Sequence, residues 1–518
     1  MNRPELLHRL SAQSSWDLVV IGGGATGLGI ALDAAVRGFS VALVEAGDFA
    51  AGTSSRTTKL VHGGVRYLAQ GNFHLVKEGL QERSLLLANA PHLAQPIPFV
   101  MPAYRWWDKA WYGMGLRLYD ALAGKSRLGK TEFLGAYETQ RRVPTIERQG
   151  LRGSVQYWDG QFDDARLAIA LARTAAHHGA CVVNYCVAVG VLREDDAIAG
   201  VAVRDMETGA RLELRSRCVV NATGVWVDQV RRFDQHNAPR MVEPSQGIHL
   251  VVDGSFLPAA RALLIPHTSD GRVLFAIPWL GSLLLGTTDT PRKDIVEEPR
   301  PTDEEVDFIL REIGRYLHKP PTRANVRSAW AGLRPLVKPV DARGKRTRTL
   351  SREHAVVVSD TGLVTVTGGK WTTYRAMAED VLEACFEKSL LPWKEGGVTR
   401  DLRLVGAPES SHVSLSAAPG LHLYGTDADV VHALRGGDLE LAPGLTTAMV
   451  RFAVREEFAR TVEDVLARRS RLLFLDAAKA AKLAHPVAAI MKEELGAEFD
   501  AEKSARDFER LADGYRLT

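Results

Sequence analysis

Apolar and polar residues follow one another in a recognisable order at the start of the chain. Residues 17–21 (DLVVI) predict a short buried strand, and the glycine-rich residues 22–27 lead into a helix that runs to about Arg37. Gly38 ends that helix, and residues 41–44 (VALV) predict the next strand. This strand–helix–strand order is typical of a Rossmann-type α/β unit.

The pattern further along predicts more helices and an antiparallel sheet. Residues 73–90 have helical spacing, and Asp163 with Asp164 can cap another helix over about 165–178. Residues 246–290 alternate apolar and polar positions between turns, as antiparallel strands do. We therefore expect a Rossmann-type domain into which an antiparallel β domain is inserted.

The regular pattern loosens between residues 387 and 402 (KSLLPWKEGGVTRDLR), and the chain beyond is mainly helical in pattern. A stretch of this kind is typical of a connection between domains. The sequence therefore predicts a C-terminal helical domain over residues 401–518.

Three glycines carry the first chemical signal. Gly22, Gly24 and Gly27 form a G-x-G-x-x-G motif between the predicted strand and helix, where glycines permit a tight turn, close approach to a pyrophosphate and close helix packing. The helix start offers N–H groups and the positive end of its dipole to phosphates. Glu45 ends the second strand, where a carboxylate can accept hydrogen bonds from ribose hydroxyls. The motif predicts a dinucleotide site, and Glu45 argues against NADP because it would repel a 2′-phosphate.

Two later segments favour FAD over NAD. Residues 219–224 (VVNATG) predict a strand that ends in a turn of small residues, suited to passing near a cofactor. Residues 365–375 predict a strand, a glycine turn and a helix start beside Lys370, which suits the negatively charged edge of a flavin. The alternative for Gly368 and Gly369 is that they form only a tight strand-to-helix turn. The cofactor-binding residues expected from the two segments are Ala222, Gly224, Gly368 and Gly369.

Composition limits the partners of the chain. The 518 residues carry a formal net charge of only +3, so we expect no nucleic-acid partner. The cysteines form no CxxC pair and no histidine cluster has metal-ligand spacing, so we expect no metal and buried thiols in a reducing compartment. Two of them, in CVVNYC, are predicted to lie on opposite faces of one strand. The four cysteines are Cys181, Cys186, Cys218 and Cys385.

The N-terminal residues contain no apolar core of the kind that signal peptides have. No apolar run reaches the length of about 18 residues that a membrane span needs. We therefore expect a cytoplasmic location.

Several segments of the sequence resemble one known family. They are similar to the FAD-dependent glycerol-3-phosphate dehydrogenases, which belong to the D-amino-acid-oxidase-like flavoproteins. The similarity spans about residues 16–385, and residues 462–472 (VEDVLARRSRL) resemble the helical domain that closes such enzymes. The other segments that carry the resemblance are residues 53–68 (TSSRTTKLVHGGVRYL), 286–289 (GTTD), 330–335 (WAGLRP) and 368–375 (GGKWTTYR).

The resemblance implies non-covalently bound FAD, oxidation of sn-glycerol 3-phosphate to dihydroxyacetone phosphate, and transfer of the electrons to a quinone. It implies an FAD-dependent oxidoreductase domain over residues 1–390. The expected FAD-binding parts are about residues 16–70, 150–225 and 330–386, and the expected substrate or cap parts are about 71–149 and 226–329.

The resemblance also extends the expected cofactor site beyond the glycines and Glu45. The flavin loop, residues 53–64, follows the second strand, and further contacts come from the middle of the chain and from the helix start near Lys370. The added cofactor-binding residues are Thr53, Ser54, Lys59, His62, Gly63, Val187 and Thr372.

Oxidation of a secondary alcohol removes a hydride from carbon and a proton from the hydroxyl, and the dianionic phosphate of the substrate calls for arginine forks. Arg334 is expected to bind substrate and polarise the hydroxyl, and Lys370 to support the flavin and contact substrate. Arg66 and Tyr67 are expected to reach the phosphate. His249 is the candidate base, because its unperturbed pKa lies near neutrality.

Each of these interpretations has an alternative. Arg334 and Arg66 are alternatively structural salt-bridge residues, and His249 is alternatively a satisfied core group. Oxygen as the acceptor would make the protein a glycerophosphate oxidase. An amine or amino-acid oxidase needs no pocket for a dianion, and a non-catalytic FAD-dependent RNA-modification partner needs a concentrated basic face.

Residues 104–119 (YRWWDKAWYGMGLRLY) mix three tryptophans with basic residues. Aromatic rings and Arg or Lys stems suit the headgroup region of a bilayer. Because a quinone resides in the bilayer, this segment predicts peripheral attachment to the cytoplasmic face of the inner membrane. The alternatives are a packed cap over the active site or an oligomer contact, including one in a homodimer.

Overall fold

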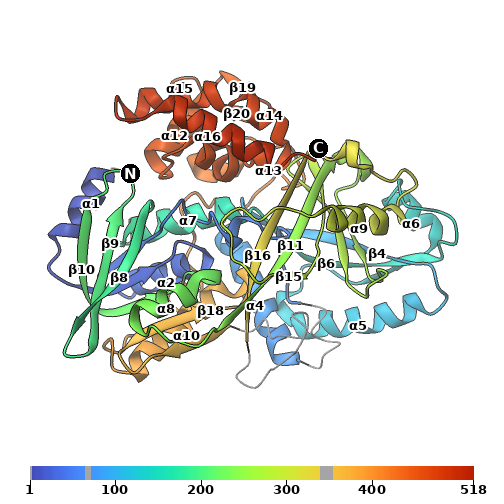
Figure 1. Ribbon diagram of the computed structural model, residues 1–518. Helices are drawn as coiled ribbons and strands as arrows, with labels where there is room; N and C mark the ends of the chain where they lie inside the picture. The colour runs from blue at the N-terminus through green and yellow to red at the C-terminus, as the bar shows by residue number, and fades with distance from the viewer. Residues whose placement is uncertain (1–2, 65–71, 339–353, 518) are drawn as a thin grey trace.

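The computed structural model describes residues 3–64, 72–338 and 354–517 (Figure 1). Two sheets lie side by side, and the C-terminal helices, drawn in red, lie above them. The first sheet is built from segments spread over the first 367 residues, so the chain crosses repeatedly between the two halves.

A mainly parallel sheet forms one half of the molecule. Its central strand β1 is buried on both faces, with Leu18 and Val20 in one apolar cluster and Val19 and Ile21 in the other. Only the edge strand β17 pairs antiparallel along the spatial order. That order is β17 (Ala355–Val358), β18 (Leu363–Thr367), β10 (Arg211–Asn221), β1 (Trp16–Ile21), β2 (Val41–Val44) and β7 (Cys181–Val183).

Helices cover one face of this sheet and antiparallel strands cover the other. The strands β8 and β9 continue from the first half of β10 as a three-stranded antiparallel layer. The covering helices are α2 (Ala25–Val36), α7 (Asp164–His177) and α10 (Tyr374–Glu387), and the opposite layer contains β8 (Cys186–Glu194), β9 (Ala197–Asp205), α1 (Arg3–Ala12) and α8 (Val227–Asp234).

The second sheet forms the other half and is almost entirely antiparallel. Among its described pairs, only β4 and β12 run parallel. Helix α9 (Asp303–Gly314) packs on one face through a stripe of buried apolar residues, and its start is closed by a capping box between Thr302 and Glu305. The strands are β3 (Leu60–Val61), β4 (Ala94–Ala103), β5 (Glu132–Leu134), β6 (Gly153–Phe162), β11 (Val242–Asp253), β12 (Ala262–Ile265), β13 (Leu274–Trp279), β14 (Ser282–Gly286), β15 (Thr290–Pro291) and β16 (Ser328–Val337).

Three further helices border this sheet, and the C-terminal domain continues its largest apolar cluster. The bordering helices are α4 (Phe73–Asn89), α5 (Asp108–Ala123) and α6 (Ala136–Arg142). The C-terminal domain contains α11 (Ala428–Ala433), a hairpin of β19 (Glu440–Ala442) and β20 (Leu445–Thr446), α12 (Thr447–Glu456), the π-helical η9 (Asp464–Arg469), α13 (Leu472–Leu475), α14 (Ala477–Lys482), α15 (Ala484–Leu495) and α16 (Ala501–Asp513).

The predicted fold class is confirmed: a Rossmann-type α/β domain, an inserted antiparallel β domain and a C-terminal helical domain. Asp163 caps α7 as expected, accepting a hydrogen bond from the N–H of Arg166 at 3.2 Å. Residues 388–420, which include most of the predicted connection, contain no helix or strand. Across the described ranges, no helix is both long and apolar enough to cross a bilayer.

The prediction for the first two cysteines is wrong. Cys181 belongs to β7 and Cys186 to β8, because the chain turns between them at Tyr185, which has a left-handed φ of 52°. Both side chains therefore enter the same apolar cluster instead of opposite faces. All four cysteines are buried free thiols.

Candidate active site

The glycine loop between β1 and α2 is shaped for close backbone contacts. A Cβ on Gly27 would lie 1.9 Å from the carbonyl oxygen of Gly22, which itself has a φ of 113°. The start of α2 has no side-chain cap from Gly24, and the hydroxyl of Ser54 accepts a hydrogen bond from the N–H of Ala25 at 3.0 Å. A helix start whose own N-cap residue is a glycine, behind a tight glycine turn, fits a pyrophosphate.

Glu45 lies at the end of β2, directly beside this loop. Its carboxylate accepts hydrogen bonds from the N–H of Gly23 at 2.6 Å and of Gly47 at 2.9 Å. Burial raises the pKa of Glu45 although both N–H groups oppose the rise. Glu45 therefore braces the glycine loop, and its expected contact with a ribose stays a prediction.

The strand end at β10 closes the far side of the loop. A Cβ on Gly22 would lie 2.7 Å from the carbonyl oxygen of Ala222, and Gly224 follows with a φ of 59°. Val187 is half-buried on β8, next to Cys186, whose N–H donates to the carbonyl of Glu45 at 2.7 Å. Ala222 therefore borders the glycine loop directly, whereas Val187 lies beside a residue that is bonded to Glu45.

The flavin loop connects α2 to both sheets. The Ser54 carbonyl accepts a hydrogen bond from Trp371 Nε1 at 2.8 Å, and the Thr53 hydroxyl donates to the carbonyl of Leu333 at 2.5 Å. The N–H of His62 donates to the hydroxyl of Thr372 at 3.2 Å. The segments that resemble the dehydrogenase family, although about 300 residues apart, therefore meet at one place.

Four more predicted residues lie at the same meeting point. Gly368 and Gly369 have left-handed φ values of 82° and 73°, so this turn needs glycine at both positions. The N–H of Gly63 donates to the hydroxyl of Tyr119 on α5 at 2.9 Å. Lys370 follows the glycine turn and is half-buried at the start of the helical segment that leads into α10.

The side chain of Lys59 is fixed inside the protein, and its expected cofactor contact stays a prediction. Its ammonium group is 0% exposed and donates to Asp164 at 2.8 Å and to the carbonyl of Ser55 at 2.7 Å. The ring centroid of Trp330 lies 4.8 Å from the Lys59 nitrogen. Burial lowers the pKa of Lys59 to about 7, although the negative charge of Asp164 opposes that shift. Lys59, itself part of the flavin loop, therefore ties the loop to Asp164 at the start of α7.

Arg334 is fixed on β16 by oxygen atoms of the GTTD segment. Its guanidinium donates to the carbonyl of Thr288 and to the hydroxyl of Thr287, each at 3.0 Å, and pairs with Asp289 at 3.3 Å. The side chain remains 21% exposed. Arg334 therefore does form a salt bridge, as the alternative interpretation expected. The same contacts also hold its guanidinium in a fixed direction.

A buried carboxylate supports this arrangement from α9. Glu305 accepts hydrogen bonds from the hydroxyls of Thr288 at 2.9 Å and Thr290 at 2.6 Å, and from Gln246 Nε2 at 2.7 Å. Because Thr288 also accepts the N–H of Ile248 at 3.1 Å, the GTTD segment is tied to β11 and α9 together. From the sequence, residues 286–289 were known only as part of the family resemblance. Their contact with Arg334 in residues 332–335 could not be predicted.

His249 lies on β11, only 2% exposed, with its ring stacked on Trp330 at a centroid distance of 4.4 Å. Its Nε2 is 3.0 Å from the hydroxyl of Thr58 in the flavin loop. Burial, followed by the charges of Lys59 and Arg334, holds the pKa of His249 well below its ordinary value. The imidazole of His249 is therefore neutral at neutral pH, and its role as the base stays a prediction.

Arg66 and Tyr67, expected at the substrate phosphate, lie outside the described residues. Sequence reasoning did not identify Thr58, Trp330 or Tyr119 as site residues. Each of them lies within or beside a segment already singled out, but only the folded chain shows which side chain each contacts. Within the described part of the chain, no three His, Cys, Asp or Glu side chains gather in a way that could hold a metal ion.

Comparison with known proteins agrees with this geometry. Residues 17–375 match the model of the FAD dependent oxidoreductase family, and residues 397–502 match the C-terminal domain of alpha-glycerophosphate oxidase. The chain therefore belongs to the FAD-dependent oxidoreductases, among the glycerol-3-phosphate dehydrogenases.

Relatives cover nearly the whole chain. A probable mitochondrial glycerol-3-phosphate dehydrogenase of Caenorhabditis elegans is 40% identical over 95% of this chain and 72% of its own length. The mitochondrial glycerol-3-phosphate dehydrogenase of Homo sapiens is 38% identical over the same shares. The solved structure of the Bacillus halodurans glycerol-3-phosphate dehydrogenase complexed with FAD has a TM-score of 0.79 and 28% identity, and covers 99% of this chain and 98% of that one.

Proposed function

We propose that this protein oxidises sn-glycerol 3-phosphate to dihydroxyacetone phosphate, with non-covalently bound FAD as cofactor and a quinone as electron acceptor. The observation that carries the proposal is the hydrogen bond from Thr53, in the flavin loop, to Leu333. This bond ties the flavin loop to the chain neighbour of Arg334, whose guanidinium is held by Asp289 and is 21% exposed.

The residues of the chain have separable roles in this reaction. Arg334 binds the substrate and polarises its hydroxyl, because a guanidinium stays charged and its planar fork matches anionic oxygen atoms. Neutral His249, paired with Thr58, is the candidate acceptor of the hydroxyl proton. FAD, when bound, supplies the acceptor for the hydride that leaves carbon. Lys370 favours negative charge at the cofactor, and Arg66 with Tyr67 is assigned to the phosphate.

The cofactor contacts follow from the cradle described above. The pyrophosphate is assigned to the glycine loop and the start of α2, and the ribose to Glu45. The flavin is assigned to the junction of the flavin loop with the turn before α10. The remaining proposed contacts are Thr53, Ser54, His62, Gly63, Val187, Ala222, Gly224, Gly368, Gly369 and Thr372.

The identity of the electron acceptor is tested by comparing reduction of a quinone with reduction of oxygen to peroxide. Purified protein turning over glycerol 3-phosphate is expected to reduce a water-soluble quinone analogue with little peroxide formed. Stoichiometric peroxide in air, without quinone reduction, would instead make the protein a glycerophosphate oxidase. Oxidation of an amino acid in preference to glycerol 3-phosphate would assign it to the amine and amino-acid oxidases.

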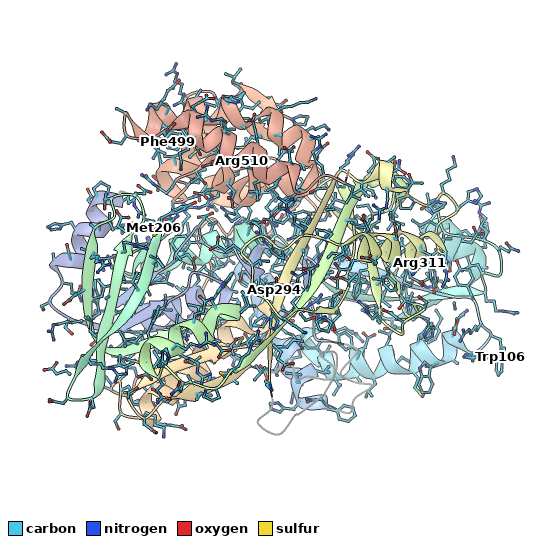
Figure 2. The ribbon with its side chains drawn as sticks, viewed as in Figure 1. Trp106, Met206, Asp294, Arg311, Phe499 and Arg510 are labelled. Atoms are coloured by element: carbon cyan, nitrogen blue, oxygen red, sulfur yellow. The ribbon has the colours of Figure 1, made fainter. Side chains whose placement is uncertain are left out.

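The outer face of helix α5, together with Trp106 just before it, is the surface that we assign to the membrane. Trp106 and Trp111 are 77% and 70% exposed, and Met114, three positions further along the same outward face, is 65% exposed. Figure 2 shows Trp106 at the edge of the molecule, and Figure 1 shows α5 on the side opposite the C-terminal domain. Exposed apolar side chains next to Arg117 and Lys109 suit an anionic bilayer surface, where a quinone is available.

This contact would place the protein peripherally on the cytoplasmic face of the inner membrane. The same exposed face suits the self-association of a homodimer, which the vesicle experiment in the Discussion distinguishes from lipid binding.

A further inference from the structure

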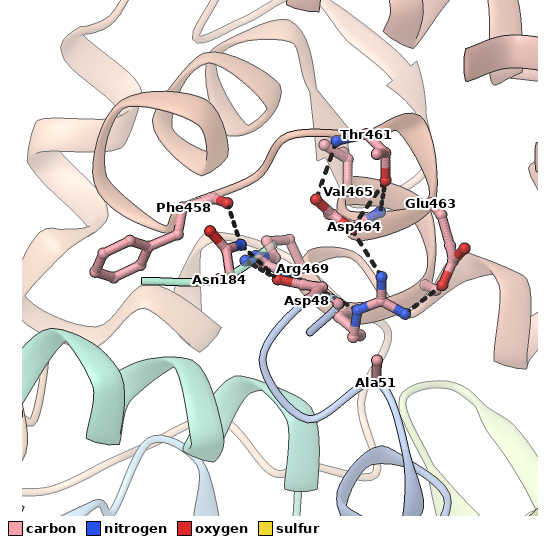
Figure 3. A network of polar contacts seen from close by, with 12 residues as sticks. Asp48, Ala51, Asn184, Phe458, Thr461, Glu463, Asp464, Val465 and Arg469 are labelled. Atoms are coloured by element: carbon pink, nitrogen blue, oxygen red, sulfur yellow. Dashed lines mark hydrogen bonds and ion pairs between the residues drawn. The ribbon is translucent and has the colours of Figure 1, made fainter. Parts of the chain in front are cut away.

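A buried cluster of charges joins the C-terminal domain to the loop that follows β2 (Figure 3). Asp48 in that loop is 1% exposed, and both Arg468 and Arg469 of η9 pair with its carboxylate. A second nitrogen of Arg469 donates to Asp48 Oδ1 at 3.0 Å, and Asn184 donates to the same oxygen at 3.2 Å. Although burial opposes ionisation, the two arginines hold the pKa of Asp48 below its ordinary value.

This carboxylate lies close to the adenosine end of the proposed cofactor site. Asp48 comes three positions after Glu45, whose carboxylate holds the N–H groups of Gly23 and Gly47. The N–H of Ala50 donates to the carbonyl of Gly23 at 3.0 Å. Arg469 therefore fixes a loop that is itself bonded on two sides to the glycine turn.

A second arginine of the same segment reaches the flavin end. Arg471, 0% exposed, donates to the carbonyl of Ser55 at 2.9 Å and to Asp164 at 3.0 Å. Ser55 follows Ser54, which binds the N–H of Ala25 at the start of α2. Lys59 donates to the same carbonyl and carboxylate, so Arg471 completes the support behind the flavin loop.

We propose that Arg469 and Arg471 are positioning residues through which the C-terminal domain shapes the FAD site. The domain holds the adenosine-side loop through Asp48 and the flavin loop through Ser55 and Asp164. Without the Arg469 guanidinium, Asp48 keeps only Arg468 and Asn184 as partners. Without the Arg471 guanidinium, Ser55 and Asp164 keep Lys59. Each loop therefore loses one fixed, buried contact and is held less firmly in its FAD-binding shape. The inference rests on FAD as the cofactor and does not depend on the substrate or the electron acceptor.

Linkage gives the proposal a second consequence. If docking of η9 favours the FAD-binding shape of both loops, binding of FAD must favour docking of η9 by the same factor. FAD is therefore expected to stabilise a segment of the C-terminal domain that is buried behind the loops.

The first measurement is the dissociation constant for FAD of reconstituted apoprotein, followed by flavin fluorescence. Arg469→Gln and Arg471→Gln are each expected to weaken FAD binding by about tenfold or more. Arg469→Lys should weaken it less, because lysine keeps a positive charge beside the carboxylate of Asp48. The matched control is Arg451→Gln. Arg451 is also a buried arginine of the C-terminal domain, but it pairs with Glu493 and Glu494 on α15, each at 2.6 Å.

FAD affinity of Arg451→Gln is expected to stay within about twofold of wild type. Equal losses in all the variants would overturn the proposal, since general destabilisation would then explain them, and so would unchanged affinity in both test variants. A wild-type protein that binds no FAD would instead contradict the assignment of the cofactor.

The second measurement needs only the wild-type chain. Hydrogen exchange of backbone amides is compared with and without FAD over residues 456–475, which include η9 and α13. We expect slower exchange in this segment when FAD is bound, with residues 484–513 unchanged. Identical exchange of residues 456–475 in both states would contradict the linkage.

Discussion

The backbone N–H of Gly63 donates a 2.9 Å hydrogen bond to the hydroxyl of Tyr119, which in turn donates to Asp159 at 2.9 Å. Tyr119 is 1% exposed on the inner face of α5, and Arg83 pairs with Asp159 at 2.9 Å. The helix assigned to the membrane on its outer face thus holds the flavin loop on its inner face.

Replacement of Tyr119 by phenylalanine removes both hydrogen bonds while it keeps the ring. We expect the holoprotein to lose about 1–3 kcal/mol of stability, because the Gly63 N–H stays buried without its acceptor. FAD should also dissociate faster. Thermal unfolding and flavin release check this, with Tyr137→Phe as the control, since Tyr137 is 81% exposed. Equal unfolding temperatures and equal flavin release in the two variants would show that the hydrogen bonds of Tyr119 do not stabilise the flavin loop.

Gly247 offers a way to move Arg334 without removing it. A Cβ at this position would lie 2.2 Å from Nη2 and 2.6 Å from Cζ of Arg334. Because the end of an arginine side chain is flexible, Gly247→Ala should fold with little loss of stability but displace the guanidinium. We expect kcat/KM for glycerol 3-phosphate to fall by about 10- to 100-fold.

The control for this substitution is Gly190→Ala, on β8, where an added Cβ meets nothing within 4 Å. Its steady-state kinetics should match those of the wild type. Wild-type kinetics in Gly247→Ala would mean that the position of Arg334 does not matter for the reaction.

His249 makes the stability of the protein depend on acidity. Its folded pKa lies well below 6.5, so on acidification the unfolded chain takes up a proton at this residue before the folded protein does. Stability contributed by neutral His249 is therefore complete above about pH 6.5 and falls as the pH falls toward the folded pKa. At a pH of about 5.5 the loss should reach about 1.4 kcal/mol relative to a pH of about 7.5.

Denaturant unfolding at the two pH values measures this loss. His249→Gln cannot take up a proton, so the difference between the two pH values should shrink by that amount. An unchanged difference would contradict the depressed pKa of His249.

The exposed tryptophans Trp106, just before α5, and Trp111, within α5, should determine membrane binding. We expect Trp106→Ala combined with Trp111→Ala to lower co-sedimentation with vesicles of anionic lipid by about tenfold or more, because burial of an aromatic side chain contributes about 1.5–3 kcal/mol. Trp393→Ala, at a tryptophan that is 69% exposed outside α5, is the control and should bind as wild type does. Unchanged sedimentation of the double variant, with loss of a dimer in solution, would reassign this face to self-association.

Local patterns predicted the elements that local chemistry determines. The glycine loop, Glu45 at the end of β2, the Asp163 cap of α7 and the glycine turn before Lys370 all lie where the sequence placed them. Each depends on residues that are neighbours in the chain, so spacing alone carries the information.

The sequence could not show contacts that form only when distant segments pack together. The ion pair of Lys59 with Asp164 joins residues 105 positions apart. The burial of His249 against Trp330, which lowers its pKa, likewise depends on two separate strands. The role of Arg469 at Asp48 spans 421 residues, and no local pattern reports such a pair.

The central claim is that an FAD-bearing site beside Arg334 accepts electrons from glycerol 3-phosphate. The most direct test is to mix the purified yellow protein with sn-glycerol 3-phosphate in the absence of oxygen and record the visible spectrum. We predict rapid loss of the oxidised-flavin absorbance, with one dihydroxyacetone phosphate formed per flavin. A protein that carries FAD but keeps its full absorbance under these conditions would contradict the account.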